Sequence, residues 1–373
     1  MAQGFDSKEV ARSAVQQALL KLGTGRPSFA VSFISREFNI NDVSATLSAF
    51  LGNTPLWGFS THYPLTVTGE QERTVIVVII SGKSLEIDAQ TVLPDELEKE
   101  DAISFSGTPS MLILAGDGAR GVSEKTLKNI KQLKTPVLGC LASGDFLQGF
   151  TTQFAGGRCV DGGLSMLGLS GAFKVGVGLG HGWQEIGFAH QIGRLQGRVL
   201  LELEGVTPAS IYEKIFGYSS AQWSSDVLSE IVPLYPLGIE VFPGSSDLFI
   251  RTPLCVQADG SFLLNASAAE GQMAHVMVGN IDTNLEAVQQ AVEMAKREIT
   301  DTRPLLTIVL VDYAWHLLLG ERIREAIAIV QRSQPDIPVV GAYTMGHVYS
   351  PDGGSTPQVL NQNFMVLMIT EKI

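Results

Sequence analysis

Pro338-Val-Val-Gly-Ala-Tyr-Thr344 has two counterparts elsewhere in the chain, Pro55-Leu-Trp-Gly-Phe-Ser-Thr61 and Pro136-Val-Leu-Gly-Cys-Leu-Ala142. Each stretch has a proline, two apolar residues, a glycine, two variable residues and then Thr or Ala. Proline is tolerated at the start of a strand, where its missing N–H does not break a ladder. Each stretch therefore predicts a short buried strand that opens with proline.

A β-rich run lies upstream of each of these strands, and a helical pattern lies between the two. The runs are Phe29–Ile34, Met111–Ala115 and Leu306–Val311. In the second and third copies the intervening apolar residues share one helix face, and they are Leu127, Ile130 and Leu133, then Ile323, Ala326, Ile327 and Val330. This order predicts a βαβ unit in each copy.

A further apolar run follows each unit after a glycine-rich loop, at Val75–Ile80, Leu164–Leu169 and Phe364–Ile369. In the first copy it is close enough to predict an antiparallel return strand. The sequence thus predicts an α/β fold of repeated βαβ-plus-return-strand units that form mixed sheets.

Two predicted helices that contain the same five-residue sequence precede the first and last units, at Ala14-Val-Gln-Gln-Ala18 and Ala287-Val-Gln-Gln-Ala291. Because they occupy the equivalent place, they indicate two domains with an internal pseudo-duplication. Periodicity is interrupted after Phe216, by Gly217–Ser220 and by Pro233–Pro236. We therefore expect an N-terminal domain at 1–225 and a C-terminal domain at 226–373.

Composition limits the partners. Of 373 residues, 45% are apolar and 17% charged, which favours a globular protein over a disordered one. A net charge of −12 opposes a phosphate backbone, so we expect no nucleic-acid partner.

The first ten residues lack a signal-peptide pattern, and the run Val75–Ile80 is too short to span a bilayer. We expect a cytoplasmic chain without a membrane partner. The cysteines Cys140, Cys159 and Cys255 form no Cys-x-x-Cys pair and predict reduced thiols.

Polar residues follow the repeated strands in register. Ligands of α/β sheets bind beyond the carboxyl ends of parallel strands, so we expect these residues to cluster at one site. Tyr313 and His316, which follow the first strand of the third unit, should face the same place. The predicted ligand-binding residues are Ser60, Thr61, His62, Asp145, Tyr313, His316, Tyr343, Thr344, Gly346 and His347. The alternative is that they form structural turns.

No sequence pattern predicts catalysis, and we expect no enzyme. The segment Gly178-Leu-Gly-His-Gly-Trp183 lacks the spacing of a dinucleotide fingerprint and predicts a tight turn that carries Trp183 into the core. There is no Gly-x-Ser-x-Gly and no His-x-x-x-His. A hydrolase that uses His316 with Asp312 is an alternative, although neither has an adjacent nucleophile.

The chain resembles the FIST domains along nearly its whole length. The N-terminal part is suggested by Gly58-Phe-Ser-Thr61, Gly182-Trp-Gln-Glu-Ile-Gly187 and Leu203-Glu-Gly205, with Pro208-Ala209, Tyr212 and Phe216-Gly217. The C-terminal part is suggested by Tyr235-Pro236, Asp259-Gly260, Glu270-Gly271, Gly341-Ala-Tyr-Thr-Met-Gly346 and Asn361. The resemblance implies a sensory module of signal transduction that binds amino acids or other small molecules.

Since no output domain is recognised, the resemblance implies a stand-alone sensor that acts through a separate signalling protein, such as a kinase or a cyclase. It implies no cofactor, unless the chain resembles the haem-binding nitric-oxide sensors of the family. In that alternative His62, His316 and His347 are the candidate axial ligands. An interaction protein that uses its loops as a partner surface is a further alternative.

The chain departs from the family pattern at the proposed pocket. The family commonly has a Ser-Cys pair and an Arg in the strand-to-helix motif, where this chain has Asp312-Tyr313 and His316. It commonly has Gly-Glu after the Thr, where this chain has Gly346-His347 and, in the first unit, Tyr63-Pro64. An acid is thus replaced by an imidazole in one place and lost in the other, and a pocket that exchanges Arg and Glu for two histidines should not keep the same charged ligand.

Overall fold

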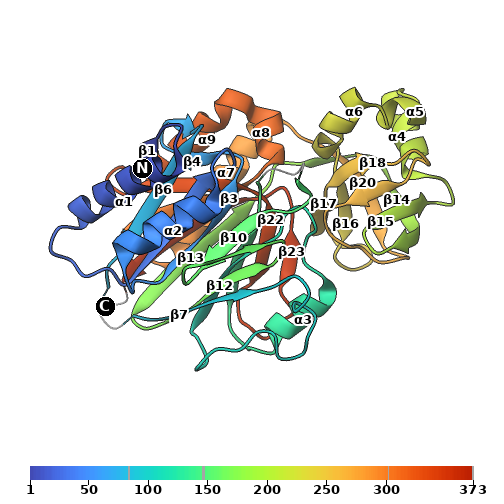
Figure 1. Ribbon diagram of the computed structural model, residues 1–373. Helices are drawn as coiled ribbons and strands as arrows, with labels where there is room; N and C mark the ends of the chain where they lie inside the picture. Colours follow the sequence, from blue (N-terminus) through green and yellow to red (C-terminus); the bar gives the residue numbers. More distant parts are fainter. Residues whose placement is uncertain (83–84, 145–147, 301, 372–373) are drawn as a thin grey trace.

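The computed structural model describes residues 1–82, 85–144, 148–300 and 302–371. Within them the strands form sheets of six, eleven and seven strands, with helices packed against them (Figure 1). The six- and eleven-stranded sheets contain both parallel and antiparallel pairs. The predicted α/β class with mixed sheets is therefore confirmed. Asp145 of the predicted site lies outside the described residues.

The three predicted units pair their strands in the same way. The first strands, β2 (Phe29–Ser35), β8 (Met111–Gly116) and β21 (Leu306–Asp312), pair in parallel with β3 (Leu56–Thr61), β9 (Val137–Ala142) and β22 (Val339–Ser350). On their other edge they pair antiparallel with β6 (Thr74–Ile80), β12 (Leu164–Ser170) and β24 (Phe364–Glu371). The return strand is present in each unit, while an origin by duplication stays a prediction.

The repeated proline and glycine have a structural reason. The carbonyl oxygens of Pro55, Pro136 and Pro338 each accept a hydrogen bond of 2.9 Å from an N–H of the preceding parallel strand. Gly58, Gly139 and Gly341 each lie directly opposite a residue of that strand. A Cβ at these glycines would lie 2.0 Å from Ser32 O, 2.5 Å from Leu114 Cγ and 2.0 Å from Val309 O. Glycine is needed where the strands approach so closely.

The chain passes from one sheet to the other between β3 and β4. The six-stranded sheet also contains β1 (Ala2–Gln3), β10 (Thr152–Ala155) and β11 (Arg158–Asp161). The eleven-stranded sheet also contains β4 (Pro64–Thr66), β5 (Gly69–Glu70), β7 (Glu86–Val92), β13 (Phe173–Gly180) and β23 (Gln358–Leu360). Because β4 pairs with β22, the first unit is carried against the third.

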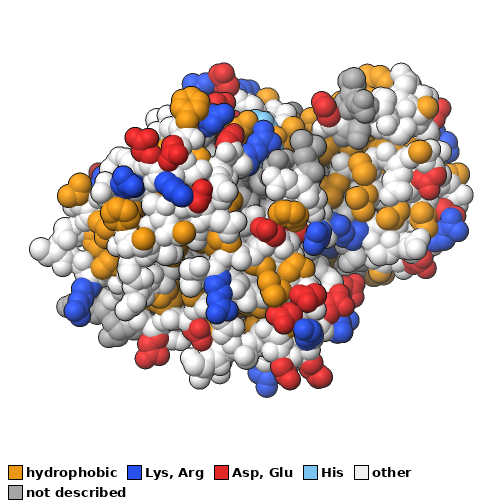
Figure 2. Space-filling model, in the orientation of Figure 1, with side chains coloured by type: hydrophobic (Ala, Val, Ile, Leu, Met, Phe, Trp, Pro, Cys, Tyr) orange, Lys and Arg blue, Asp and Glu red, His pale blue; other side chains and the backbone are white. Residues whose placement is uncertain are grey.

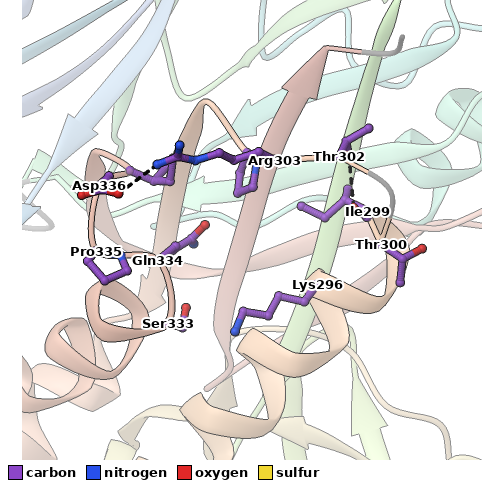
Figure 3. A pocket seen from close by; sticks show the side chains of 11 residues that line it. Lys296, Ile299, Thr300, Thr302, Arg303, Ser333, Gln334, Pro335 and Asp336 are labelled. Atoms are coloured by element: carbon purple, nitrogen blue, oxygen red, sulfur yellow. Dashed lines mark hydrogen bonds and ion pairs between the residues drawn. The ribbon is translucent and has the colours of Figure 1, made fainter.

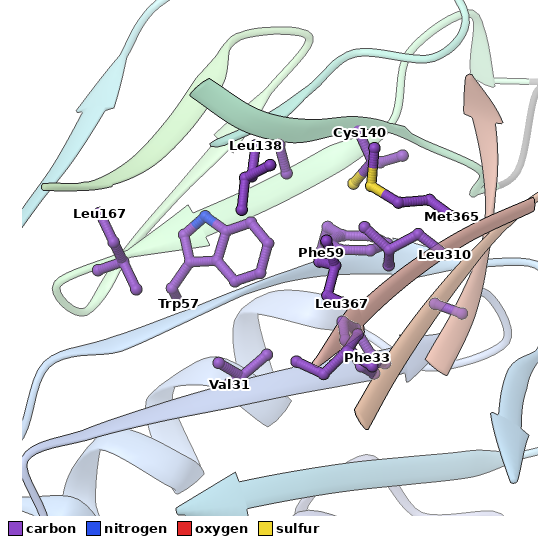
Figure 4. Close-up of a cluster of buried hydrophobic side chains, with 14 of the residues drawn as sticks. Val31, Phe33, Trp57, Phe59, Leu138, Cys140, Leu167, Leu310, Met365 and Leu367 are labelled. Carbon is purple, nitrogen blue, oxygen red and sulfur yellow. The ribbon is translucent and has the colours of Figure 1, made fainter. Parts of the chain in front are cut away.

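The two sheets stack face to face, and helices cover their outer faces. The core between them contains Phe33, Trp57 and Phe59 from the six-stranded sheet and Leu310 and Leu367 from the eleven-stranded one (Figure 4). Outside the first sheet lie α1 (Ser7–Leu22) and α2 (Ile40–Leu51). Outside the second lie α3 (Glu124–Lys131), α7 (Ile281–Glu298), α8 (Ala314–Leu319) and α9 (Ile323–Ser333). These four layers are called the body below.

The glycines before Trp183 belong mainly to a strand, so the predicted tight turn is wrong for Gly178 and Gly180. Both lie in β13, beneath α7. A Cβ at Gly178 would lie 1.7 Å from Ala291 O, and one at Gly180 would lie 2.5 Å from Ala287 O. The glycines let the alanine face of α7 rest on the strand, and Trp183 is buried as expected.

The seven-stranded sheet is antiparallel and curls into a near-barrel, which forms a separate lobe at the right of Figure 1. Its strands are β14 (Gln184–Gln196), β15 (Val199–Leu203), β16 (Leu237–Glu240), β17 (Leu248–Arg251), β18 (Pro253–Val256), β19 (Phe262–Leu264) and β20 (Met273–Val278). Its helices are α4 (Pro208–Phe216), α5 (Ser220–Trp223) and α6 (Asp226–Ile231). We call residues 184–278 the barrel lobe. Position 225, the predicted boundary, lies between α5 and α6, and a boundary there stays a prediction.

The described helices include none that is both long and apolar enough to cross a membrane.

Candidate functional site

Three of the predicted strand ends meet at one place. Thr61 ends β3, Ser143 follows β9, and Tyr343 lies where β22 runs beside β21. The carbonyl oxygen of Tyr343 accepts hydrogen bonds from Thr61 Oγ1 at 2.9 Å and from Ser143 Oγ at 2.7 Å. An isolated parallel bridge joins Thr61 to Ser143. The structure therefore brings the ends of all three units together.

His62 is buried just beyond this junction and is held on both ring nitrogens. Its Nδ1 lies 3.0 Å from Ser143 O, and its Nε2 lies 2.7 Å from Arg36 Nη1. Because a carbonyl oxygen only accepts and a guanidinium only donates, Nδ1 carries the proton and Nε2 accepts. The ring is thus a neutral link between Ser143 and Arg36.

An aromatic cluster surrounds His62 on the side of the third unit. The ring of Tyr313 lies 4.2 Å from that of His62 and is stacked on His316, with ring centres 4.9 Å apart. Tyr63 and Tyr343 lie against His316 at 5.4 and 5.6 Å. Tyr63, Tyr313 and His316 are partly exposed, so the cluster forms part of the surface.

Glu70 on β5 brings a carboxylate to the aromatic cluster. Its Oε1 accepts hydrogen bonds from His316 Nδ1 and from Tyr343 Oη, both at 2.7 Å. The acid is absent from the two motif positions, and this carboxylate comes from outside them. Glu70 lies six residues past Pro64, and the β4–β5 hairpin brings it back to the site. Arg36, which follows β2, is also absent from the predicted site residues, because no local pattern marks its contact with His62.

The tyrosines of the cluster are hydrogen-bond donors rather than charges. Burial raises the pKa of Tyr343 well above its usual value, and the neighbouring Glu70 carboxylate raises it further. Burial also raises the pKa values of Tyr63 and Tyr313. At neutral pH all three phenols stay protonated.

Thr344, Gly346 and His347 are packed inside the sheet rather than at the surface. Thr344 and His347 are fully buried, and His347 Nε2 donates to Leu310 O at 3.0 Å. Burial lowers the pKa of His347 to about 4. A Cβ at Gly346 would lie 2.5 Å from Asn361 Nδ2. These residues support the site from behind.

Asp312 is also buried, and its bonds do not go to His316. Its carboxylate accepts the backbone N–H of Ala314 at 3.0 Å and that of Gln362 at 2.7 Å. Burial raises the pKa of this carboxyl to about 6. The carboxylate that bonds to His316 is Glu70, so the Asp312 and His316 pairing considered for a hydrolase is not formed.

A small pocket lies on the other side of Arg36. It has a volume of about 210 Å³ and opens between the end of β3, the first turn of α2 and the segment before β10. Ser60, Thr152 and Asp161 contribute polar side chains, and Arg36 contributes its guanidinium. Of the predicted residues Ser60 lies here, and Arg36 connects the pocket to His62.

A larger hollow lies at the opposite edge of the eleven-stranded sheet. It has a volume of about 680 Å³ and is lined by the ends of α7 and α9, with Arg303 and Asp336 paired across it at 3.1 Å (Figure 3). Both side chains of this pair are mostly exposed. The amino ends of parallel strands are not where α/β sheets bind ligands, so we take the carboxyl-end site as the candidate.

Across the described part of the chain, no group of three or more His, Cys, Asp or Glu side chains is arranged to hold a metal ion. Two family models match the chain, the FIST N domain over residues 28–206 and the FIST C domain over residues 208–350. Together they cover most of the 373 residues. No curated protein shows significant similarity to the chain.

Proposed function

The chain belongs to the FIST family of sensory domains in signal transduction, and we propose that it binds a small polar ligand where its strand ends meet. The ligand occupies the pocket beside Ser60 and is bound without being turned over. The signal passes to a separate protein, such as a kinase or a cyclase.

One contact carries this proposal, the hydrogen bond from Arg36 Nη1 to His62 Nε2. Arg36 lines the pocket, and His62 lies against Tyr313 in the aromatic cluster. A ligand that draws the guanidinium toward itself weakens this hydrogen bond to His62. The buried ring then changes its hydrogen bonding, because a weakened bond at a buried polar atom costs free energy. Ligand binding is thereby coupled to the surface formed by Tyr63, Tyr313 and His316.

The pocket favours a small ligand with an anionic group. A volume of about 210 Å³ is below that of a drug-sized site. Arg36 offers a planar set of donors. The Asn39 side chain caps the N–H of Asp42 at the start of α2, and the other first-turn N–H groups have no acceptor in a preceding turn of the helix. Asp161 at the rim, whose Oδ1 accepts from Thr152 Oγ1 at 2.7 Å, is suited to an ammonium or hydroxyl group of the ligand.

Native mass spectrometry of the purified chain tests the proposal by identifying any small molecule that co-purifies. Binding of that molecule is then measured by calorimetry on Arg36→Gln and Ser60→Ala, with Arg12→Gln on the exposed face of α1 as the matched control. We expect Arg36→Gln to weaken binding at least about tenfold, which corresponds to about 1.4 kcal/mol. Binding that is equally strong in Arg36→Gln and the control contradicts this site.

Haem binding is a second candidate, and it rests on His316. Because His316 Nδ1 bonds to Glu70, its Nε2 is left with the lone pair that an axial ligand needs, and the side chain is 25% exposed. His62 does not fit this role because both of its nitrogens are engaged, and His347 does not because it is buried. Haem titration of the apoprotein should shift the Soret band in the wild type and not in His316→Ala. A titration without a Soret shift rejects this candidate.

A further inference from the structure

A second pocket lies between the body and the barrel lobe. It has a volume of about 670 Å³. Its body wall is formed by residues 94–98 and 120–126 with Gly162, and its lobe wall by residues 195–198 and 267–270. In Figure 2 the barrel lobe stands apart from the body, and basic side chains gather near the junction. Pockets between structural units are frequent ligand sites.

Two arginines from opposite walls face this pocket, Arg120 and Arg198. Arg198 is partly buried, and its Nη1 donates to Asn265 O at 3.3 Å. Arg120 Nε donates to Gly149 O, also at 3.3 Å, and lies 3.8 Å from Asp117 Oδ2 in an ion pair. A guanidinium has five N–H donors, so each arginine keeps donors for a ligand. Burial lowers the pKa of Arg198, and the Asp117 carboxylate partly offsets this effect.

The loop that carries Arg120 is held rigidly. It reads Gly116-Asp-Gly-Ala-Arg-Gly121 and joins β8 to α3. Asp117 is buried, and its Oδ1 accepts from Ala119 N, Thr151 N and Thr151 Oγ1 at 2.9–3.0 Å. A Cβ at Gly118 would lie 1.9 Å from Ala142 O, so the loop backbone rests on β9. The loop therefore presents the Arg120 side chain, and not a backbone cradle, to the pocket.

The rest of the pocket is apolar with an acidic rim. Leu97, Val122 and Leu195 line it together with exposed Glu98, Glu124 and Glu270. Glu124 is paired with Lys128 at 3.8 Å, and Glu270 Oε1 accepts from Leu195 N at 3.0 Å. The electrostatic effect of the exposed carboxylates on a ligand is screened by salt. Arg198 is partly desolvated, so its attraction for an anion in the pocket is screened less. The strongest interaction that the pocket offers is thus to an oxyanion.

We propose that this pocket is a second ligand site, which binds an organic oxyanion through Arg120 and Arg198 and packs its apolar part on Leu97, Val122 and Leu195. Because the two arginines belong to the body and the lobe respectively, a bound oxyanion bridges the two. This pocket shares no lining residue with the strand-end pocket, although Gly162 directly follows Asp161 of that pocket.

Calorimetry on the full chain at low ionic strength tests the site with inorganic phosphate, acetate and hexanoate as probes. We expect hexanoate to bind more tightly than acetate because of its apolar chain, and phosphate binding to show whether a dianion is also accepted. Arg198→Gln and Arg120→Gln should each lose affinity at least about tenfold. Lys21→Gln, which removes the same charge at an exposed position of α1, should bind like the wild type.

Circular dichroism of the variants separates loss of binding from loss of fold. Arg120→Gln is the safer variant, because its side chain is 56% exposed. The proposal is overturned if none of the three probes binds, or if binding is unchanged in both arginine variants. It is also overturned if Arg36→Gln abolishes binding while Arg120→Gln does not, since the oxyanion then occupies the strand-end pocket.

Discussion

At Gly341 a single methyl group has no room, because a Cβ would lie 2.0 Å from Val309 O and 2.5 Å from Val309 Cγ2. The obstructing atom is backbone in a central parallel pair, which cannot move without disturbing β21. We expect Gly341→Ala to lower the free energy of unfolding by about 1–3 kcal/mol in urea titration. Gly107→Ala, at an exposed position with no atom within 4 Å, should stay within about 0.5 kcal/mol of the wild type. Equal losses in both variants contradict this reason for the repeated glycine.

Two buried titratable groups have opposite effects on the stability of the fold as the pH falls. The pKa of Asp312 is about 6 in the fold against about 3.9 when unfolded, so the fold gains stability from this carboxyl as pH falls from 6 to 4. Without that gain, Asp312→Asn should lose more stability than the wild type over the same range, by about 2–3 kcal/mol. Urea titrations at pH 7, 6, 5 and 4 measure the difference. Identical pH slopes would show that Asp312 ionises normally.

His347 acts in the other direction. Its pKa is about 4 in the fold against about 6.5 when unfolded, so the unfolded chain takes up the proton first and stability is lost as pH falls from 6.5 to 4. In the same titrations His347→Gln should lose less stability than the wild type, by about 3 kcal/mol. Gln can still donate to Leu310 O, the acceptor of His347 Nε2. A variant as acid-sensitive as the wild type would contradict the assignment.

Besides the backbone pairing of β4 with β22, one carboxylate links the β4–β5 hairpin to the third unit. Glu70 Oε1 accepts from His316 on α8 and from Tyr343 on β22. Glu70→Gln weakens both bonds, because a neutral amide oxygen is a poorer acceptor than a carboxylate. We expect faster deuterium uptake in residues 64–71 and a loss of about 1–3 kcal/mol. Glu72→Gln, at an exposed position two residues on, should leave the uptake unchanged.

The same hairpin shows where prediction from the sequence stops. The parallel pairs and the return strands could be predicted because each strand has a local apolar pattern, and the second strand of each pair also has its proline and glycine. Arg36 and Glu70 could not, because their partners are brought to them by the passage of the chain from one sheet to the other after Thr61. Among the ten predicted site residues, Thr61, His62, Tyr313, His316 and Tyr343 are brought together, while Thr344 and His347 are buried behind them.

The barrel lobe was missed as a unit for a different reason. Its strands are short apart from β14, and the pairings that close the sheet, β14 with β20, β15 with β19 and β16 with β20, join segments distant in sequence. β14 itself pairs with β20 and β15 through a bulged register, which breaks strict alternation. A near-closed antiparallel sheet is specified by long-range pairing more than by local sequence.

Gln362 joins the lobe to the body. Its N–H donates to Asp312 Oδ2, and its carbonyl oxygen accepts from the indoles of Trp183 and Trp315. Its side-chain Nε2 reaches into the lobe, to Pro233 O at 2.6 Å and to Thr252 Oγ1 at 3.0 Å. The residue has a positive φ of 55°, an uncommon backbone conformation for a side chain other than glycine. One residue thus bonds the strand-end carboxylate, two buried tryptophans and the lobe.

Gln362→Ala distinguishes the backbone hydrogen bonds of Gln362 from those of its side chain, since it keeps the former and removes both side-chain bonds into the lobe. We expect a loss of about 1–3 kcal/mol, with faster deuterium exchange in peptides that contain Pro233 or Thr252 and unchanged exchange in β21. Gln358→Ala, at an exposed position of β23 whose side chain bonds only locally to Thr356 O, is the matched control. Faster exchange spread evenly over body and lobe would mean that Gln362 supports the whole fold. Faster exchange confined to the lobe would mean that Gln362 fixes the position of the lobe on the body. It would then also set the width of the pocket between the two.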